Sequence, residues 1–163
     1  MAGMFTGIQL SDQFDAIILP PDMAWTDEFE WTPVVQDANH TLTGALIVEC
    51  AEKQTGRPIT LQSGDDRAWI TGDKLQLLQT WAARAGGYFG LVIRGQMRTV
   101  IFRHQDAPAL EAEPVMFHGD EPGTGEFKVT IKLQEIDLTS WHNPPAPAPD
   151  PAPDPDPDPQ PDP

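Results

Sequence analysis

Alternation of apolar and polar residues is the main pattern along this chain, and it is clearest between residues 127 and 134. In this segment, FKVTIKLQ, four apolar residues alternate with four polar ones. A period of two is typical of a half-buried antiparallel strand. Segments 88–93 and 98–102 flank the residues RGQM, and Gly95 predicts a tight turn that joins them as a hairpin.

Shorter β-branched or apolar segments predict further strands. They are residues 17–19, 41–48, 58–61, 68–70 and, with a weaker pattern, 110–116. Strands spaced about 8–14 residues apart favour a mainly β protein with an antiparallel β-sandwich or barrel-like domain over βαβ units. Pro20 and Pro21 end the first segment, which predicts an edge or first strand there.

One segment, at about residues 73–85, predicts a flanking α-helix. Its apolar residues lie three or four positions apart and form one stripe: Leu75, Leu78, Trp81, Ala82 and Ala85. Thr71 is a suitable N-cap, and Asp73 lies in the first turn, where the helix dipole favours a negative charge. Gly86 and the glycine after it predict the end of the helix.

Composition divides the chain into three parts. We expect an N-terminal arm over residues 1–16, a β-sandwich domain over 17–143 and a disordered Pro/Asp-rich tail over 144–163. Eleven of the 18 prolines lie in that tail. Proline removes the amide donor and restricts φ, so the tail can form neither a helix nor a central strand. It is either a solubilising segment or a tether that docks on a basic surface.

The charge and cysteine content exclude several classes of protein. The chain has 25 acidic and 10 basic residues, a net charge of −15. This charge argues against a generic binder of the phosphate backbone, and we expect no direct sequence-specific binding of nucleic acid. No apolar run approaches the roughly 20 residues that span a bilayer, so we expect no membrane insertion. A single cysteine, Cys50, excludes an internal disulfide framework and a Cys-rich zinc site.

Two acidic segments are the candidates for chemistry. One is Asp65-Asp66, which is followed by an arginine, and the other is the turn that contains His118, Asp120 and Glu121. Neither has the spacing of a metal site or a catalytic pair, and an acidic solvent-exposed turn explains both. We therefore expect no enzyme activity, no catalytic residue, no metal and no cofactor.

Aromatic residues gather in the segment AWTDEFEW, residues 24–31. A strand here would place Phe29 and Trp31 on one face and in the core. Alternatively, Trp25 or Phe29 contacts a neighbouring subunit, because Trp and Phe are favoured anchors at interfaces.

Basic residues also gather, on or beside the predicted hairpin, at Arg94, Arg98 and Arg103. Facing the acidic surface of another copy, they would add charge complementarity to an interface. A solvated hairpin explains the same residues. The residues predicted for a subunit interface are therefore Trp25, Phe29, Arg94, Arg98 and Arg103.

Three stretches of the chain resemble small tail proteins of long, non-contractile-tailed bacteriophages. They are LPPDMAWTDEFEWTPV, TLTGALIVECAEKQTGRPITLQSGDDRAWIT and TVIFRHQDAPALEAEPV. The resemblance covers about residues 17–137 and implies a minor tail or baseplate protein of the distal-tail type. The residues that match the pattern are expected to define the fold: Trp25, Trp31, Gly44, Gly56, Arg57, Pro58, Asp65, Asp66, Trp69 and Arg103.

This resemblance implies a non-catalytic ring that connects the tail tube to the adsorption apparatus. The partners would be other copies of the chain and neighbouring tail proteins, in the virion tail and, during assembly, in the host cytoplasm. The Pro/Asp-rich tail departs from the family pattern. The alternative function is a free protein- or carbohydrate-binding β-sandwich module with exposed tryptophans as its platform.

Overall fold

The computed structural model describes residues 7–116 and 125–138, which form eleven strands and one helix. The first six strands are β1 (Ile8–Ser11), β2 (Ala16–Leu19), β3 (Ala24–Trp25), β4 (Val34–His40), β5 (Leu46–Glu52) and β6 (Pro58–Gln62). They are followed by β7 (Ile70–Thr71), α1 (Gly72–Ala82), β8 (Phe89–Ile93), β9 (Gln96–Phe102), β10 (Leu110–Pro114) and β11 (Glu126–Glu135).

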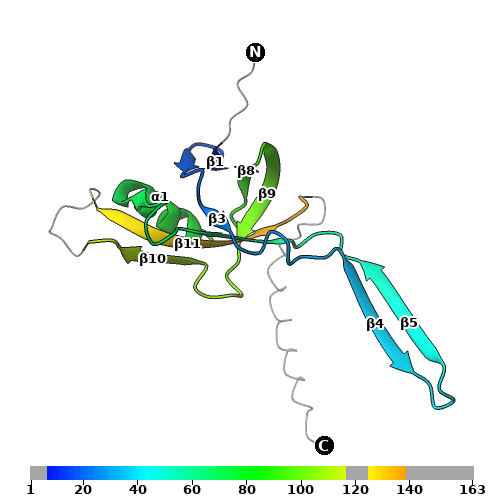
Figure 1. Cartoon of the computed structure of the whole chain (residues 1–163). Coiled ribbons are helices and arrows are strands. Elements are labelled where there is room, and N and C mark those ends of the chain that lie inside the picture. The colour runs from blue at the N-terminus through cyan, green and yellow to red at the C-terminus, as the bar shows by residue number, and fades with distance from the viewer. Residues whose placement is uncertain (1–6, 117–124, 139–163) are drawn as a thin grey trace, which may run out of the picture.

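The strands form a main sheet and a separate two-stranded hairpin (Figure 1). The main sheet has the order β2-β1-β8-β9-β11-β6-β3, and all its neighbouring strands are antiparallel. The long strand β11 joins its two halves, because β6 and β7 pair with one of its edges while β9 and β10 pair with the other. Strands β4 and β5 pair with each other outside this sheet.

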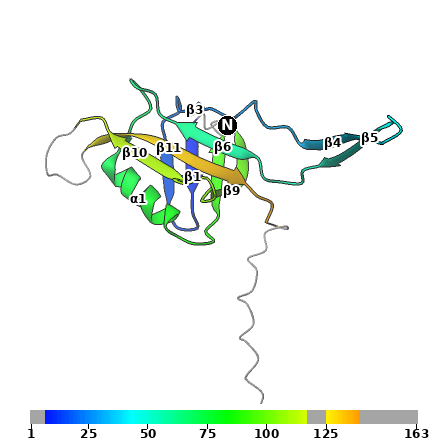
Figure 2. The ribbon, with the colours of Figure 1, turned by 90° about the horizontal axis from the view of Figure 1, so that it is seen from below.

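The core lies on the inward face of the sheet, where α1 packs against β7, β10 and β11 (Figure 2). Trp81 of the helix is 1% exposed and stacks on Phe89 of β8, with their ring centroids 5.2 Å apart. Phe89 in turn meets Phe102 of β9 edge-on at 5.3 Å. These three aromatic rings connect the helix to the centre of the sheet.

Two polar contacts join α1 to the other end of the sheet. The Nζ of Lys74 donates a hydrogen bond to the carbonyl oxygen of Ile18 in β2, at 2.8 Å. Arg84, just after the helix, forms an ion pair with Asp12 in the turn between β1 and β2. The helix therefore contacts both β10 and the β1–β2 end of the sheet.

The predicted fold class is confirmed: the protein is mainly β, with antiparallel sheets and one α-helix. The alternation in 127–134 corresponds to β11, and its apolar positions Val129, Ile131 and Leu133 are buried. Segments 88–93 and 98–102 correspond to the β8–β9 hairpin, with Gly95 in its turn at φ +74°. The helix begins after Thr71, as expected, but ends at Ala82, about three residues early.

Three local predictions are wrong. Residues 41–45 form the turn of the β4–β5 hairpin instead of continuing a strand over 41–48, since the N–H of Thr41 bonds to Ala45 O and Gly44 has φ +83°. Residues 26–30 form turns, so no strand carries Phe29 into the core. Residues 8–11, expected in an N-terminal arm, form β1, which pairs with β2 and β8.

Residues 1–6, 117–124 and 139–163 lie outside the described part of the chain. The predicted Pro/Asp-rich tail, its boundary at residue 143 and the turn that contains His118 therefore lie outside it as well. Within residues 7–116 and 125–138, no helix has the length and apolar character needed to cross a bilayer.

Candidate interaction surface

The β4–β5 hairpin projects from the body of the molecule and is the feature that stands out most in the fold (Figures 1 and 2). We call residues 34–52 the arm. Its seven residue pairs run from Val34 with Glu52 at the base to His40 with Leu46 at the tip. Each residue of β4 and β5 is exposed, so both faces of this two-stranded sheet are open to solvent.

The arm carries more apolar side chains than a solvated hairpin requires. The large exposed ones are Val34, Val35, Leu42, Leu46, Ile47 and Val48. Side chains alternate between the two faces of a strand. The register therefore places Val34, Ala38, Leu46, Val48 and Cys50 on one face, together with Gln36, His40 and Glu52. We call it the apolar face of the arm, because five of its eight residues are apolar.

The opposite face of the arm carries two of its three carboxylates. Asp37 and Glu49 are directly paired there, beside Asn39 and Ile47. The third carboxylate, Glu52, lies at the base of the arm on its apolar face. Residues 34–52 contain no lysine and no arginine, so the arm is acidic as well as apolar.

The base of the arm is attached to the body by a group of aromatic and cationic side chains. The N–H of Lys53 donates to the carbonyl oxygen of Pro33 at 2.7 Å and continues the hairpin pairing into the body. The guanidinium of Arg57 lies 4.7 Å from the ring centroid of Trp25 and 5.8 Å from that of Trp31. Cation–π contacts of this kind hold the loop before β4 against the strand β6 that follows the arm.

A hydrogen-bonded network fixes the same loop from its other side. Asp27 accepts hydrogen bonds from the indole Nε1 of Trp25 at 2.9 Å and from the backbone N–H of Thr60 at 2.8 Å. The hydroxyl of Thr60 donates to the second carboxylate oxygen of Asp27 at 2.7 Å. That hydroxyl accepts a hydrogen bond from Arg103 at 2.9 Å. The network joins β3, β6 and the residue after β9, so several contacts fix the position of the loop that leads into the arm.

The five predicted interface residues differ in their burial and in their contacts within the chain. Trp25 is half-buried beneath Arg57, and the side chains of Arg98 and Arg103 are only 16% and 14% exposed. Arg98 pairs with Glu135 at 2.9 Å, and Arg103 pairs with Asp27 at 3.6 Å. These three residues therefore serve contacts within the chain.

The other two predicted residues are more accessible. Phe29 is 89% exposed, in the turns between β3 and β4. Arg94 is 66% exposed at the tip of the β8–β9 hairpin, where its Nη2 lies 2.7 Å from the carboxylate of Glu28. Arg94 thus ties the hairpin turn to the loop that leads into the arm.

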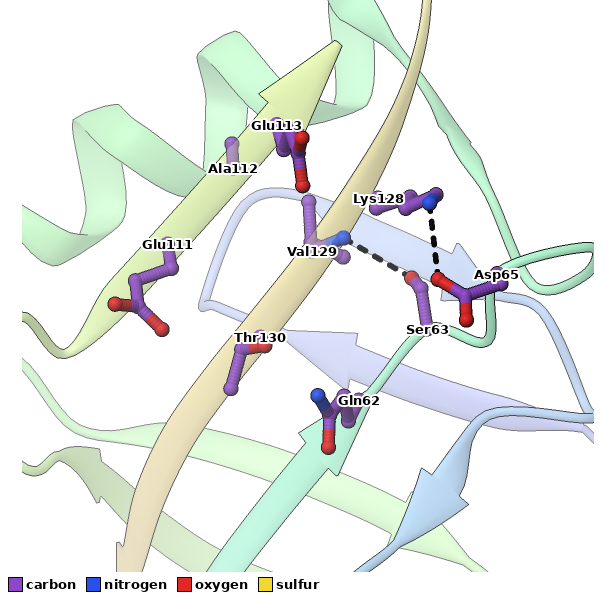
Figure 3. A pocket seen from close by; sticks show the side chains of 9 residues that line it. All are labelled: Gln62, Ser63, Asp65, Glu111, Ala112, Glu113, Lys128, Val129 and Thr130. Carbon is purple, nitrogen blue, oxygen red and sulfur yellow. Dashed lines mark hydrogen bonds and ion pairs between the residues drawn. The ribbon is translucent and has the colours of Figure 1, made fainter. Parts of the chain in front are cut away.

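Of the predicted acidic pair Asp65-Asp66, Asp65 borders an open hollow of about 630 Å³ on the outward face of the sheet (Figure 3), and Asp66 is not among the residues that line it. Glu111 and Glu113 of β10 lie beside Lys128 and Thr130 of β11 in this hollow. We call the surface around this hollow the charged face. Lys128 pairs with Asp65 at 3.0 Å. Among the described residues, no group of three or more His, Cys, Asp or Glu side chains is placed to hold a metal ion.

Sequence reasoning missed the arm. The signal that could have found it is a pair of seven-residue segments, VVQDANH and LIVECAE, on either side of a five-residue stretch that contains Gly44. Neither segment alternates strictly between apolar and polar residues, because both faces of the arm are exposed. The usual strand pattern, which reports one buried face, is therefore absent.

No protein family, curated protein sequence or solved structure matches this chain. Its projecting arm, the contacts at the base of that arm and the charged face are the features from which a function can be derived.

Proposed function

We propose that this protein is a non-catalytic structural subunit of a bacteriophage tail, part of a ring at the tail tip or baseplate that connects the tube to the adsorption apparatus. The arm makes the contacts between subunits. The observation that supports an assembly role is that every residue of β4 and β5 is exposed, including large apolar residues that are 46–55% exposed. The resemblance of residues 17–137 to phage tail proteins supports the place of that assembly in a tail.

The physical argument for a partner begins with the stability of the arm. An isolated two-stranded hairpin is at best marginally stable in water, because it buries too little apolar surface. The arm also leaves the outer edges of β4 and β5 without a neighbouring strand in the described structure. Unpaired strand edges and exposed apolar faces favour association with another chain. Contact with a partner would remove both from water.

A ring of identical subunits would cover the exposed arm and its unpaired strand edges without a second kind of protein. In a head-to-tail interface, each subunit gives its arm to the next and receives one from the previous subunit. Closure of the ring then covers every arm. The cation–π contacts of Arg57 and the network around Asp27 favour this role, because they set the direction in which each arm leaves the body.

The alternative function, a free binding module, requires an exposed aromatic platform. Of the four tryptophans in the described residues, Trp81 is buried in the core and the other three, Trp25, Trp31 and Trp69, are half-buried. Trp25 also lies beneath the guanidinium of Arg57. Phe29 is exposed, but it stands in a turn next to charged residues. The arm therefore favours the assembly function.

The mass of the purified protein in solution tests this proposal. Light scattering over a wide concentration range would compare the full chain with a variant whose residues 38–48 are replaced by Asn-Gly, a two-residue turn suited to a hairpin. We expect the full chain to form rings with a defined multiple of 17.9 kDa, visible by negative-stain microscopy. The shortened variant should be monomeric, and cooperative thermal unfolding should show that its body still folds.

The proposal has clear contrary outcomes. A full chain that stays monomeric at every concentration, or a shortened variant that assembles as well as the full chain, would overturn it. Immunogold labelling of phage particles tests the second part of the proposal, and label absent from the tail would contradict a place in the virion.

A further inference from the structure

The body of the molecule has a second outward sheet face that differs from the charged face. It lies over β2, β1, β8 and β9, on the side opposite the core. The register places Ile18, Gln9, Val92 and Met97 side by side in one row across these four strands. Ile18 is 53% exposed and Met97 is 76% exposed, so large apolar side chains stand at both ends of the row.

A second row on the same face consists of small and polar residues. Ala16, Ser11, Gly90 and Thr99 lie side by side in it. The side chain of Met97 reaches toward this row, since a Cβ built on Gly90 would lie 3.2 Å from its Cε. We call these two rows the uncharged face, because none of their eight residues is acidic or basic.

We propose that the uncharged face receives the arm of a second copy of this chain, which packs on it through the apolar face of the arm. This inference rests on the proposed function and adds the surface that completes the interface. The two surfaces would meet as two sheets do, about 10 Å apart with their side chains interdigitated.

Charge favours the uncharged face over the charged face as the site for the arm. The arm carries three carboxylates and no cationic side chain, and the whole chain has a net charge of −15. Of the three carboxylates, only Glu52 lies on the apolar face that would pack. On the charged face, the apolar side chains of the arm would displace water from Glu111 and Glu113, and burial of charged groups against apolar surface is costly. The uncharged face avoids this cost.

The dimensions of the two surfaces agree. Seven residue pairs at about 3.3 Å each give the arm a length of roughly 23 Å. Four strands at about 4.8 Å spacing give the uncharged face a width of roughly 19 Å. The arm is therefore long enough to cross all four strands. A second copy is the occupant that the chain itself supplies, since it carries both the arm and the face.

Cys50 provides a direct test, because it is the one cysteine of the sequence and lies on the apolar face of the arm. A wild-type chain would be mixed with a tagged Cys50→Ser chain that has one new cysteine in the row, at Ile18, Gln9, Val92 or Met97. After mild oxidation, we expect a disulfide between the two different chains at one or two of these positions.

A matched control places the new cysteine on the charged face, in a tagged chain with Cys50→Ser and Glu113→Cys. This position is also exposed on a strand, and we expect no disulfide with the wild-type chain. If no position in the row cross-links above this control while the full chain still forms rings, the uncharged face is not the acceptor and the proposed function stands. If the chain is monomeric and no cross-link forms, both proposals are overturned.

An independent readout uses charge. Met97→Glu would bury a carboxylate against the apolar face of the arm, and we expect it to weaken assembly at least tenfold in Kd. Met97→Leu keeps the apolar side chain and should assemble like the wild type. Circular dichroism checks that both variants fold, which the high exposure of Met97 favours. Equal assembly of the two variants would overturn the inference.

Discussion

The guanidinium of Arg57 lies over the indole ring of Trp25, with its carbon 4.7 Å from the ring centroid. The same guanidinium donates a hydrogen bond to the carbonyl oxygen of Glu28 at 2.8 Å. Trp25 precedes the arm in the chain and Arg57 follows it. Their contact therefore closes the chain at the base of the arm and sets where the arm leaves the body.

This contact should be measurable as a coupling free energy. Trp25→Leu and Arg57→Met should each lower the free energy of unfolding, because each removes the cation–π contact. A partly desolvated pair of this kind contributes about 0.5–2 kcal/mol, so the double variant should lose that much less than the sum of the single losses. Urea denaturation of the four proteins measures the difference.

The matched control for this cycle combines Trp25→Leu with Lys74→Met. Lys74 lies on α1 and bonds to Ile18, away from the base of the arm. The effects of these two substitutions should be additive within about 0.5 kcal/mol. Equal coupling in both cycles would contradict a specific interaction between Trp25 and Arg57.

The attachment of α1 to the sheet should depend on Trp81. Trp81→Ala removes a buried ring that stacks on Phe89, and replacements of this kind cost about 3–5 kcal/mol. Gln79→Ala, on the exposed side of the same helix, should change the free energy of unfolding by less than about 0.5 kcal/mol. Thermal or denaturant unfolding would compare them, and a small effect of Trp81→Ala would show that the helix is not part of the cooperative core.

Acid stability should depend in part on Asp12. Its pKa lies below the ordinary value of 3.8, first because its carboxylate accepts a hydrogen bond from the backbone N–H of Gln13 and second because it binds Arg84. A carboxyl group with a lowered pKa in the folded state adds stability above its unfolded pKa. That stability is lost as the pH falls through the folded pKa.

The substitution Asp12→Asn should therefore destabilise the protein near neutral pH, and its difference from the wild type should shrink below about pH 4. Unfolding measured as a function of pH tests this. Arg84→Gln removes only the second cause, so an NMR titration should show the pKa of Asp12 rising part of the way. An unchanged pKa in that variant would contradict the role of Arg84.

The turn of the β8–β9 hairpin should tolerate few residue types at Gly95. Arg94 and Gly95 both have positive φ, at +50° and +74°, the arrangement that two-residue hairpin turns favour. No atom lies within 4 Å of a Cβ built on Gly95, so Gly95→Ala adds only backbone strain. We expect a loss of about 1 kcal/mol for alanine.

Asparagine is the comparison at this position. It adopts positive φ more readily than alanine, so Gly95→Asn should be the milder change in the same denaturation experiment. An alanine variant as stable as the wild type would contradict the strained conformation of this turn.

The elements whose sequence signal is local can be predicted from the sequence alone. The alternation in 127–134 predicts β11 because one face of that strand is buried and the other is not. Gly95 and the flanking apolar segments predict the β8–β9 hairpin, and the spacing of Leu75, Leu78 and Trp81 predicts α1. In each case the residues that decide the structure are close together in the chain.

The burial and the contacts of the predicted interface residues follow from the tertiary structure and not from the local sequence. Arg103 meets Thr60 and Asp27 across 43 and 76 positions of the chain, and Arg98 meets Glu135 across 37. No local sequence pattern indicates such pairs. The sequence is therefore compatible with basic residues that are solvated and with basic residues that lie in an interface.

The arm and the two outward faces were likewise decided by tertiary structure. Whether Val48 or Met97 is covered depends on which strands pack over it, and residue type alone does not specify that. The uncharged face exists because the pairing of β1, β2, β8 and β9 brings together residues from positions 9 to 99. Local periodicity sets the elements, whereas long-range pairing sets the surfaces they leave exposed.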